Sequence, residues 1–78
     1  MSARLVEVFA RVLKLPADGL SDATAPENTA AWDSLAAMEL VAEIEATFGV
    51  ELTTREIMRM RSLALAREVL RARGVPDV

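Results

Sequence analysis

The residues of this chain best placed for chemistry are Asp33 and Ser34, which lie where a long polar segment gives way to an amphipathic pattern. Asp33 can accept a hydrogen bond from a backbone N–H in the first turn of a helix, which predicts Ser34 at the first helical position. There the hydroxyl lies beside unpaired N–H groups and the positive end of the helix dipole. Both features favour an anion, so the position suits a phosphate ester.

Ser34 has no partner in the sequence that could make it a catalytic nucleophile. The chain contains neither histidine nor cysteine, and no lysine or arginine lies between Lys14 and Arg55. A serine nucleophile needs an adjacent base. We therefore expect no catalytic residue and interpret Ser34 as an attachment point. Without histidine and cysteine, we expect no metal site either.

The length and composition indicate a single small helical domain over residues 1–78. Its 53% of hydrophobic residues are mostly alanine, leucine and valine, which favour helix packing over a β-sandwich. No stretch approaches the roughly 20 apolar residues that span a bilayer. Because the N-terminal residues do not form a signal-peptide pattern and cysteine is absent, we expect a cytoplasmic protein that does not bind membranes.

Charge is distributed unevenly along the chain. Residues 1–52 carry nine acidic and three basic side chains, whereas residues 53–78 carry six arginines and three acidic side chains. The acidic first part argues against nucleic acid as a partner, and no aromatic residue lies among the six arginines to stack on bases. The first part instead favours a protein partner with a basic surface.

The elements that must position Ser34 follow from the spacing of apolar residues and from helix-ending signals. We predict an all-α, small four-helix bundle with three longer helices and one short third helix. The predicted helices span residues 3–14, 34–48, about 54–60 and 63–73, with a long loop over residues 15–32 between the first two. The loop is expected to be pinned to the core by Leu15, Leu20 and Trp32.

Local signals set the expected helix ends. Thr53 and Glu56 match a capping box that opens the third helix, and Ser62 can cap the fourth. The stop signals are Pro16, Gly49 and Gly74.

The helix over residues 34–48 has two apolar faces rather than one. The predicted core face consists of Ala37, Leu40, Val41, Ile44 and Phe48. A second stripe consists of Leu35, Met38 and Ala42, flanked by Glu39, Glu43 and Glu45. Since one apolar face is enough to fold a helix, the second favours a docking surface for basic-rimmed partners. The alternative is that this stripe packs beneath the loop and that the glutamates are an ordinary solvated face.

Two further groups of residues have a structural interpretation. Trp32 is expected to be a core residue where the loop meets the second helix. Arg55, Arg59 and Arg61 are expected to be solvated, with partner binding as the other possibility.

Together these features resemble the acyl carrier protein family. The resemblance covers nearly the whole chain, and it is closest at Trp32-Asp33-Ser34-Leu35, Met38-Glu39-Leu40 and Glu45-Ala46-Thr47-Phe48-Gly49-Val50. It implies that 4′-phosphopantetheine is attached covalently to Ser34, with Asp33 matching the acidic residue that precedes the modified serine. Leu35, Met38, Glu39, Ala42 and Glu43 would form the partner-binding face.

The resemblance also implies the function and the partners. A discrete carrier would hold an acyl or aminoacyl group as a thioester for a fatty-acid-like, polyketide or nonribosomal-peptide pathway. Its partners would be a phosphopantetheinyl transferase with coenzyme A, a loading ligase or transferase, and downstream condensing, modifying or transfer enzymes. The short termini favour a stand-alone subunit, and the family resemblance suggests a monomer.

The chain departs from the family pattern in two places. Ala31-Trp32-Asp33 replaces the glycines that peptidyl carriers usually place before the serine, which is nearer the acyl-carrier type. Arginines interrupt the acidic third helix of fatty-acid carriers, which favours a dedicated secondary pathway over housekeeping fatty-acid synthesis. The residues alone leave a second function open, a helical adaptor that uses the same face without a cofactor. An independent enzyme is the least favoured reading, because the chain lacks catalytic side chains and the length to build a cleft.

Overall fold

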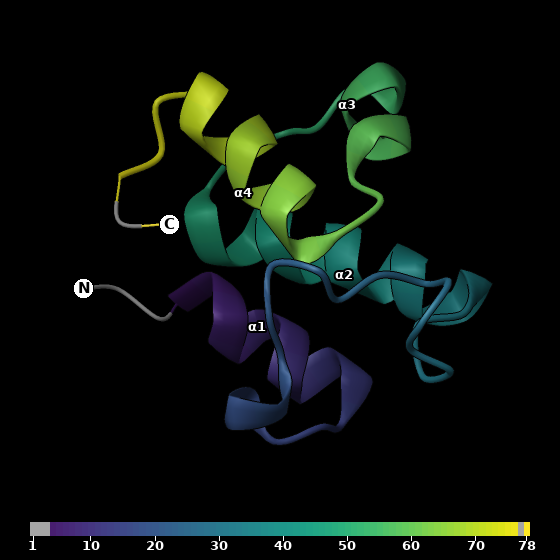
Figure 1. Cartoon of the computed structure of the whole chain (residues 1–78). Helices are drawn as coiled ribbons and strands as arrows, with labels where there is room; N and C mark the ends of the chain where they lie inside the picture. Colours follow the sequence, from purple (N-terminus) through teal and green to yellow (C-terminus); the bar gives the residue numbers. More distant parts are fainter. Residues whose placement is uncertain (1–3, 77) are drawn as a thin grey trace.

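The computed structural model describes residues 4–76 and 78, and within them every regular element is a helix. In chain order the elements are α1 (Arg4–Leu13), a 3₁₀ turn η1 (Ala17–Gly19), α2 (Ser34–Phe48), α3 (Thr54–Arg59) and α4 (Leu63–Ala72) (Figure 1). The predicted all-α bundle with a short third helix is confirmed, although position 3 of the predicted first helix lies outside the described residues. No helix in this part of the chain is long and apolar enough to cross a membrane.

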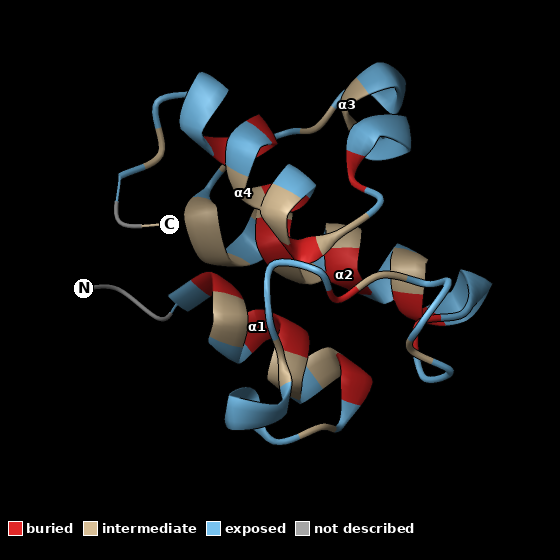
Figure 2. Ribbon diagram, in the orientation of Figure 1, coloured by how far each residue is buried: buried red, intermediate tan, exposed pale blue. Residues whose placement is uncertain are grey.

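The core lies between α1, α2 and α4, whose buried faces meet at the centre of the molecule (Figure 2). α1 contributes Leu5, Val8, Phe9 and Leu13, and α4 contributes Leu63, Ala66, Val69 and Leu70. In the last turn of α1, Val12 contributes less, because it is only half-buried.

The buried face of α2 differs from the predicted one. Ala36, Leu40 and Ile44 are buried, whereas Ala37, Val41 and Phe48 are only half-buried. Compared with the prediction, α2 is therefore rotated about its own axis, so that the side carrying Ala36 faces the core formed with α1 and α4. The side of α2 that carries Ala37 and Val41 faces the short α3, which covers it incompletely.

α1 and α2 lie antiparallel, and contacts at their ends fix this arrangement. The guanidinium of Arg4 lies 4.8 Å from the centre of the Phe48 ring and donates a hydrogen bond to the Thr47 carbonyl. At its other end α1 stops at Leu13, one residue before the predicted end at residue 14. Lys14 there adopts a left-handed conformation with φ 58°, which turns the chain away before Pro16.

The long loop is ordered by its own turns and by the start of α4. Thr24 is buried, and its backbone carbonyl accepts a hydrogen bond from the Leu63 N–H at 2.9 Å. The Asp22 carbonyl accepts a second bond from the Ala64 N–H, and the Asp22 carboxylate pairs with Arg67. Because a helix start leaves its first N–H groups unpaired, the loop completes the first turn of α4. Leu15, Leu20 and Trp32 all pack against the core, as predicted.

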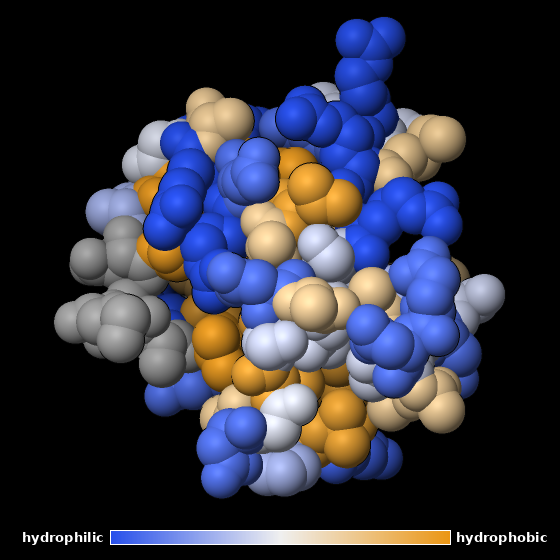
Figure 3. All heavy atoms as spheres, viewed as in Figure 1, coloured by the Kyte–Doolittle hydropathy of each residue, from blue (hydrophilic) through white to orange (hydrophobic). Residues whose placement is uncertain are grey.

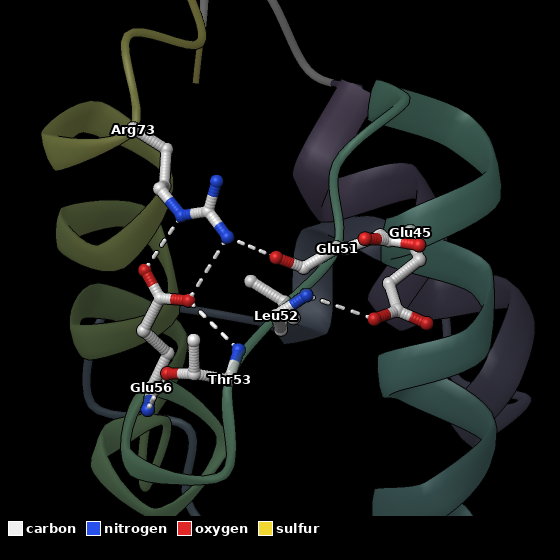
Figure 4. A network of polar contacts seen from close by, with 6 residues as sticks. All are labelled: Glu45, Glu51, Leu52, Thr53, Glu56 and Arg73. Carbon is white, nitrogen blue, oxygen red and sulfur yellow. Dashed lines mark hydrogen bonds and ion pairs between the residues drawn. The ribbon is translucent and has the colours of Figure 1, made fainter.

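α3 is held at its N-terminal end by the polar network in Figure 4. The predicted capping box is present, with Thr53 and Glu56 each accepting a hydrogen bond from the other's backbone N–H. Arg73, at the end of α4, donates to both carboxylate oxygens of Glu56, at 2.7 and 3.2 Å, and to the Glu51 carbonyl. The Glu45 carboxylate of α2 accepts a bond from the Leu52 N–H at 2.9 Å. α3 is thereby tied to both α2 and α4.

We expect the contribution of Glu56 to stability to disappear in acid. Hydrogen bonds from Arg73, followed by the bond from the Thr53 N–H, lower the pKa of Glu56 from 4.5 to about 2. Because the folded state favours the carboxylate, the stabilisation is fully present above pH 4.5 and is lost as the pH falls towards about 2. Thermal unfolding followed by circular dichroism should show Glu56→Gln less stable than the parent at neutral pH, with the difference shrinking in acid. A difference independent of pH would contradict this assignment.

Candidate functional site

The predicted cap at the start of α2 is present. Asp33 is in extended conformation, and its Oδ1 accepts a hydrogen bond from the Ala36 N–H at 2.9 Å. Its backbone carbonyl accepts the first helical bond, from the Ala37 N–H, also at 2.9 Å. Ser34 is therefore the first helical residue, and it is exposed. Asp33 fixes where the helix begins and, with it, the position of Ser34.

The Ser34 position offers an unoccupied hydroxyl and two unpaired donors. Within the described part of the chain, no residue forms a hydrogen bond with the Ser34 Oγ or accepts one from the Ser34 or Leu35 N–H. These N–H groups point out of the helix at the positive end of its dipole. The start of α2 can thus hold an anionic ester on Ser34 without breaking any bond that supports the fold.

Ser34 differs in this respect from the other described serines. Ser62 caps α4 by accepting the Leu65 N–H at 3.0 Å, and the Ser21 Oγ accepts the Ala23 N–H at 3.2 Å. Both hydroxyls therefore take part in local structure. Among the serines that the structure describes, Ser34 alone has a hydroxyl free for attachment chemistry.

A core contact directly before the site positions the start of α2. Trp32 is buried, and its ring meets the Phe9 ring of α1 edge-on, with the centroids 5.2 Å apart. This confirms the interpretation of Trp32 as a core residue. The aromatic contact anchors the last loop residues on α1, so that the chain enters α2 with Ser34 facing solvent.

The second apolar stripe of α2 is exposed, and the alternative that it packs beneath the loop is wrong. The Leu35 side chain is 68% exposed and that of Met38 is 71% exposed, and Ala42 is exposed as well. Leu35 and Met38 are the largest apolar side chains that α2 leaves in solvent. We call Leu35, Met38 and Ala42 the α2 ridge.

A groove of about 420 Å³ separates the α2 ridge from α1. Its walls combine charged and apolar side chains, namely Arg11, Val12, Lys14, Leu35, Glu39, Ala42 and Glu43. Arg11 Nη2 and Glu43 Oε1 form an ion pair at 3.1 Å. Glu39 makes no hydrogen bond or ion pair within the described residues. Of the two glutamates that line this groove, it is therefore the one whose carboxylate is not paired.

The structure separates the three glutamates that the sequence places beside the ridge. Glu39 and Glu43 line the groove on the α1 side, whereas Glu45 lies on the opposite side and supports the link to α3. The groove residues Arg11 and Lys14 belong to α1 and its C-terminal end, and no signal in the sequence placed them beside α2. The spacing of apolar residues along the sequence can show which residues share a helix face, but it cannot show which helix lies next to that face.

Replacing the cap should weaken the start of α2. For Asp33→Ala we expect a loss of about 1 kcal/mol in the free energy of unfolding, because the Ala36 N–H loses its acceptor. Urea unfolding followed by circular dichroism measures this loss. Asp33→Asn, which keeps a side-chain acceptor, should recover most of it. Equal losses in both variants would show that the carboxylate charge, rather than the cap, matters.

Comparison with known proteins agrees with this geometry. The family model described as the phosphopantetheine attachment site matches residues 3–70. A search of curated proteins found no significant match. The matched region begins at α1, includes α2 with Ser34 at its start, and ends within α4. The chain therefore belongs to the phosphopantetheine attachment site family, whose members are carrier proteins that hold 4′-phosphopantetheine covalently.

Proposed function

We propose that residues 1–78 form one acyl carrier domain in which Ser34 carries the 4′-phosphopantetheine. The observation that carries this assignment is the free, exposed Ser34 hydroxyl at the start of α2, beside two unpaired backbone N–H groups. These groups fit a phosphodiester, because the N–H groups and the helix dipole favour its negative charge. Asp33 is proposed to hold this helix start in place through its cap.

The cofactor supplies a terminal thiol that carries an acyl or aminoacyl group as a thioester. The protein's own residues do no bond chemistry in this proposal. They hold the attachment point at the surface, and they present the α2 ridge to the enzyme that acts on the carried acyl or aminoacyl group. Tethering then raises the local concentration of this group at the docked enzyme.

A carrier of this family interacts with a phosphopantetheinyl transferase and with the enzymes of its pathway. For this chain we propose a transferase that uses coenzyme A, a loading ligase or transferase, and downstream enzymes of a fatty-acid-like, polyketide or nonribosomal-peptide pathway. Leu35, Met38, Glu39, Ala42 and Glu43 are the proposed contact residues. Leu35, Met38 and Glu39 support this best, since all three are exposed without a structural role on the surface.

Intact-protein mass spectrometry tests the proposal. The purified chain is incubated with coenzyme A, Mg²⁺ and a transferase of broad specificity, and any adduct is located by fragmentation. We expect a single phosphopantetheine adduct on Ser34. Folded protein without an adduct, or an adduct at another residue, would refute the assignment and leave a helical adaptor as the better interpretation.

A further inference from the structure

The groove between α1 and the α2 ridge, here called the α1–α2 groove, begins beside Ser34. Its lining includes Leu35, the residue that follows Ser34, and continues along α2 to Glu43. At roughly 1.5 Å per residue this stretch is about 12 Å long. The groove volume of about 420 Å³ lies within the range of roughly 300–1,000 Å³ that is typical of small-molecule sites. A flexible group attached to Ser34 is therefore within reach of a groove of suitable size.

The two walls of the α1–α2 groove carry a donor and an acceptor that are both unpaired. Lys14 lies on the α1 side and Glu39 on the α2 side, and both are exposed. Neither forms a hydrogen bond or ion pair within the described residues, whereas Arg11 and Glu43 pair with each other at 3.1 Å. An ammonium group only donates hydrogen bonds and a carboxylate only accepts them. The groove therefore offers both kinds of polar partner to a bound group.

The backbone at Lys14 does not call for a lysine. Its φ of 58° is left-handed, and the Leu15 N–H closes the turn by donating to the Ala10 carbonyl at 3.1 Å. Glycine adopts this conformation without steric cost and is the usual residue at such a helix end. The side chain of Lys14 thus has no part in forming the turn, and its ammonium group is left to act at the groove.

The groove on the other side of the α2 ridge has a different character. It has a volume of about 270 Å³ and is lined only by apolar residues, Ala37, Met38, Val41 and Ile57. Its side chains therefore offer no hydrogen-bond donor or strong acceptor. Figure 3 shows that hydrophobic side chains also reach the surface in other patches among hydrophilic ones. Exposed apolar surface alone does not single out a site, whereas the combination of polar and apolar walls beside Ser34 does.

The chemistry of 4′-phosphopantetheine matches the α1–α2 groove. After the phosphodiester, the arm contains a branched dimethyl unit with a hydroxyl, then two amides and the terminal thiol. Each amide has an N–H that donates and a carbonyl that accepts, so the arm needs partners of both kinds. The dimethyl unit can cover Val12 and Leu35, of which Leu35 is 68% exposed, and this contact removes apolar surface from water.

We propose that the 4′-phosphopantetheine arm folds back into the α1–α2 groove when no enzyme is docked. Lys14 donates to the carbonyl groups of the arm, Glu39 accepts from its amide N–H groups, and Val12 and Leu35 contact its dimethyl unit. This inference rests on the proposed attachment to Ser34. Because Leu35 and Glu39 also belong to the proposed partner face, a docked enzyme displaces the arm from the groove.

Nuclear magnetic resonance of the modified chain tests this proposal. The isotope-labelled protein carries an unlabelled arm, and nuclear Overhauser effects are recorded between the dimethyl protons of the arm and the protein. We expect contacts to the methyl groups of Val12 and Leu35. Amide shifts between the unmodified and modified chains should extend from Ser34 to Lys14 and Glu39.

Two isosteric variants identify the polar partners. Lys14→Gln and Glu39→Gln should each lower the ratio of bound to free arm roughly two- to fivefold, because one exposed contact to a charged group is lost. The intensity of the arm contacts to Val12 and Leu35 reports this ratio. Circular dichroism should show both variants folded like the parent.

Matched controls remove the same charges away from the groove. Arg59→Gln on α3 and Glu7→Gln on α1 replace exposed side chains that make no hydrogen bond or ion pair within the described residues. Arg61 is less suitable, because it pairs with Glu27 at 3.3 Å. Both control variants should keep the arm contacts at the intensity of the parent.

Three results would overturn the proposal. They are an arm without contacts beyond the residues next to Ser34, contacts to Met38, Val41 and Ile57 instead, or equal losses in the groove variants and their controls. Intact mass is measured on the same samples. A Ser34 adduct without groove contacts refutes this inference alone, whereas absence of the adduct refutes the carrier function itself.

Discussion

Ser34→Ala is expected to abolish the addition of 4′-phosphopantetheine while leaving the helical bundle folded. The substitution removes only a hydroxyl that makes no hydrogen bond within the described residues. Alanine is also the most favourable residue for a helix, and the Asp33 cap does not depend on the Ser34 side chain. The intact mass after incubation with coenzyme A and the transferase should therefore stay that of the unmodified chain. The circular dichroism spectrum should match that of the parent.

Ser62→Ala provides a matched control at another helix start. Its Oγ caps α4, so the variant should lose about 1 kcal/mol of stability and still accept the cofactor on Ser34. Ser34→Ala is thus expected to prevent modification without loss of stability, whereas Ser62→Ala is expected to lose stability and still be modified. A modified Ser34→Ala protein would place the attachment elsewhere, and an unfolded one would mean that Ser34 has a structural role.

Phe9→Ala is expected to unfold a large fraction of the protein. Phe9 is fully buried at the centre of the core and forms the edge-on contact with Trp32. Truncating a buried phenylalanine costs about 3–5 kcal/mol. A chain of this length has a total stability of roughly 4–12 kcal/mol, so the loss is a large share of it. Urea unfolding followed by circular dichroism should show a much lower midpoint or no folded baseline.

Two further variants separate the core contact from a general effect on α1. Phe9→Leu keeps most of the apolar volume and should be much less destabilising. Val12→Ala alters a half-buried side chain on the same helix and should also have a smaller effect. If Phe9→Ala remained as stable as Val12→Ala, the contact with Trp32 would not anchor the entry to α2.

The helix boundaries could be predicted from the sequence because local chemistry sets them. Asp33, Ser62 and the pair Thr53 and Glu56 cap α2, α4 and α3 as predicted, and Gly49 ends α2 in a left-handed conformation with φ 67°. Each signal involves residues within about one helical turn of each other. The end of α1 is the exception, since the turn at Lys14 acts before Pro16 does.

The neighbours of each helix face could not be predicted in the same way. The spacing within one helix shows that Leu35, Met38 and Ala42 share a face of α2, but only the structure shows that this face is exposed. The burial of Ala36, the pairing of Glu43 with Arg11 and the bond from Leu52 to Glu45 depend on how α1 and α3 lie against α2. Those arrangements follow from contacts between residues far apart in sequence. The spacing of apolar residues within one helix does not reveal such contacts.

The hydrogen bonds from Leu63 and Ala64 to the loop have a consequence for how the molecule opens. The loop carbonyls of Thr24 and Asp22 protect these two amides, so their hydrogens can exchange with solvent only when the loop lifts away from α4. Lifting the loop from α4 therefore breaks both bonds and leaves these two N–H groups at the start of α4 without their acceptors. The segment that leads into Ser34 draws its order from a helix near the opposite end of the chain, which makes the position of the serine sensitive to changes far from it in sequence.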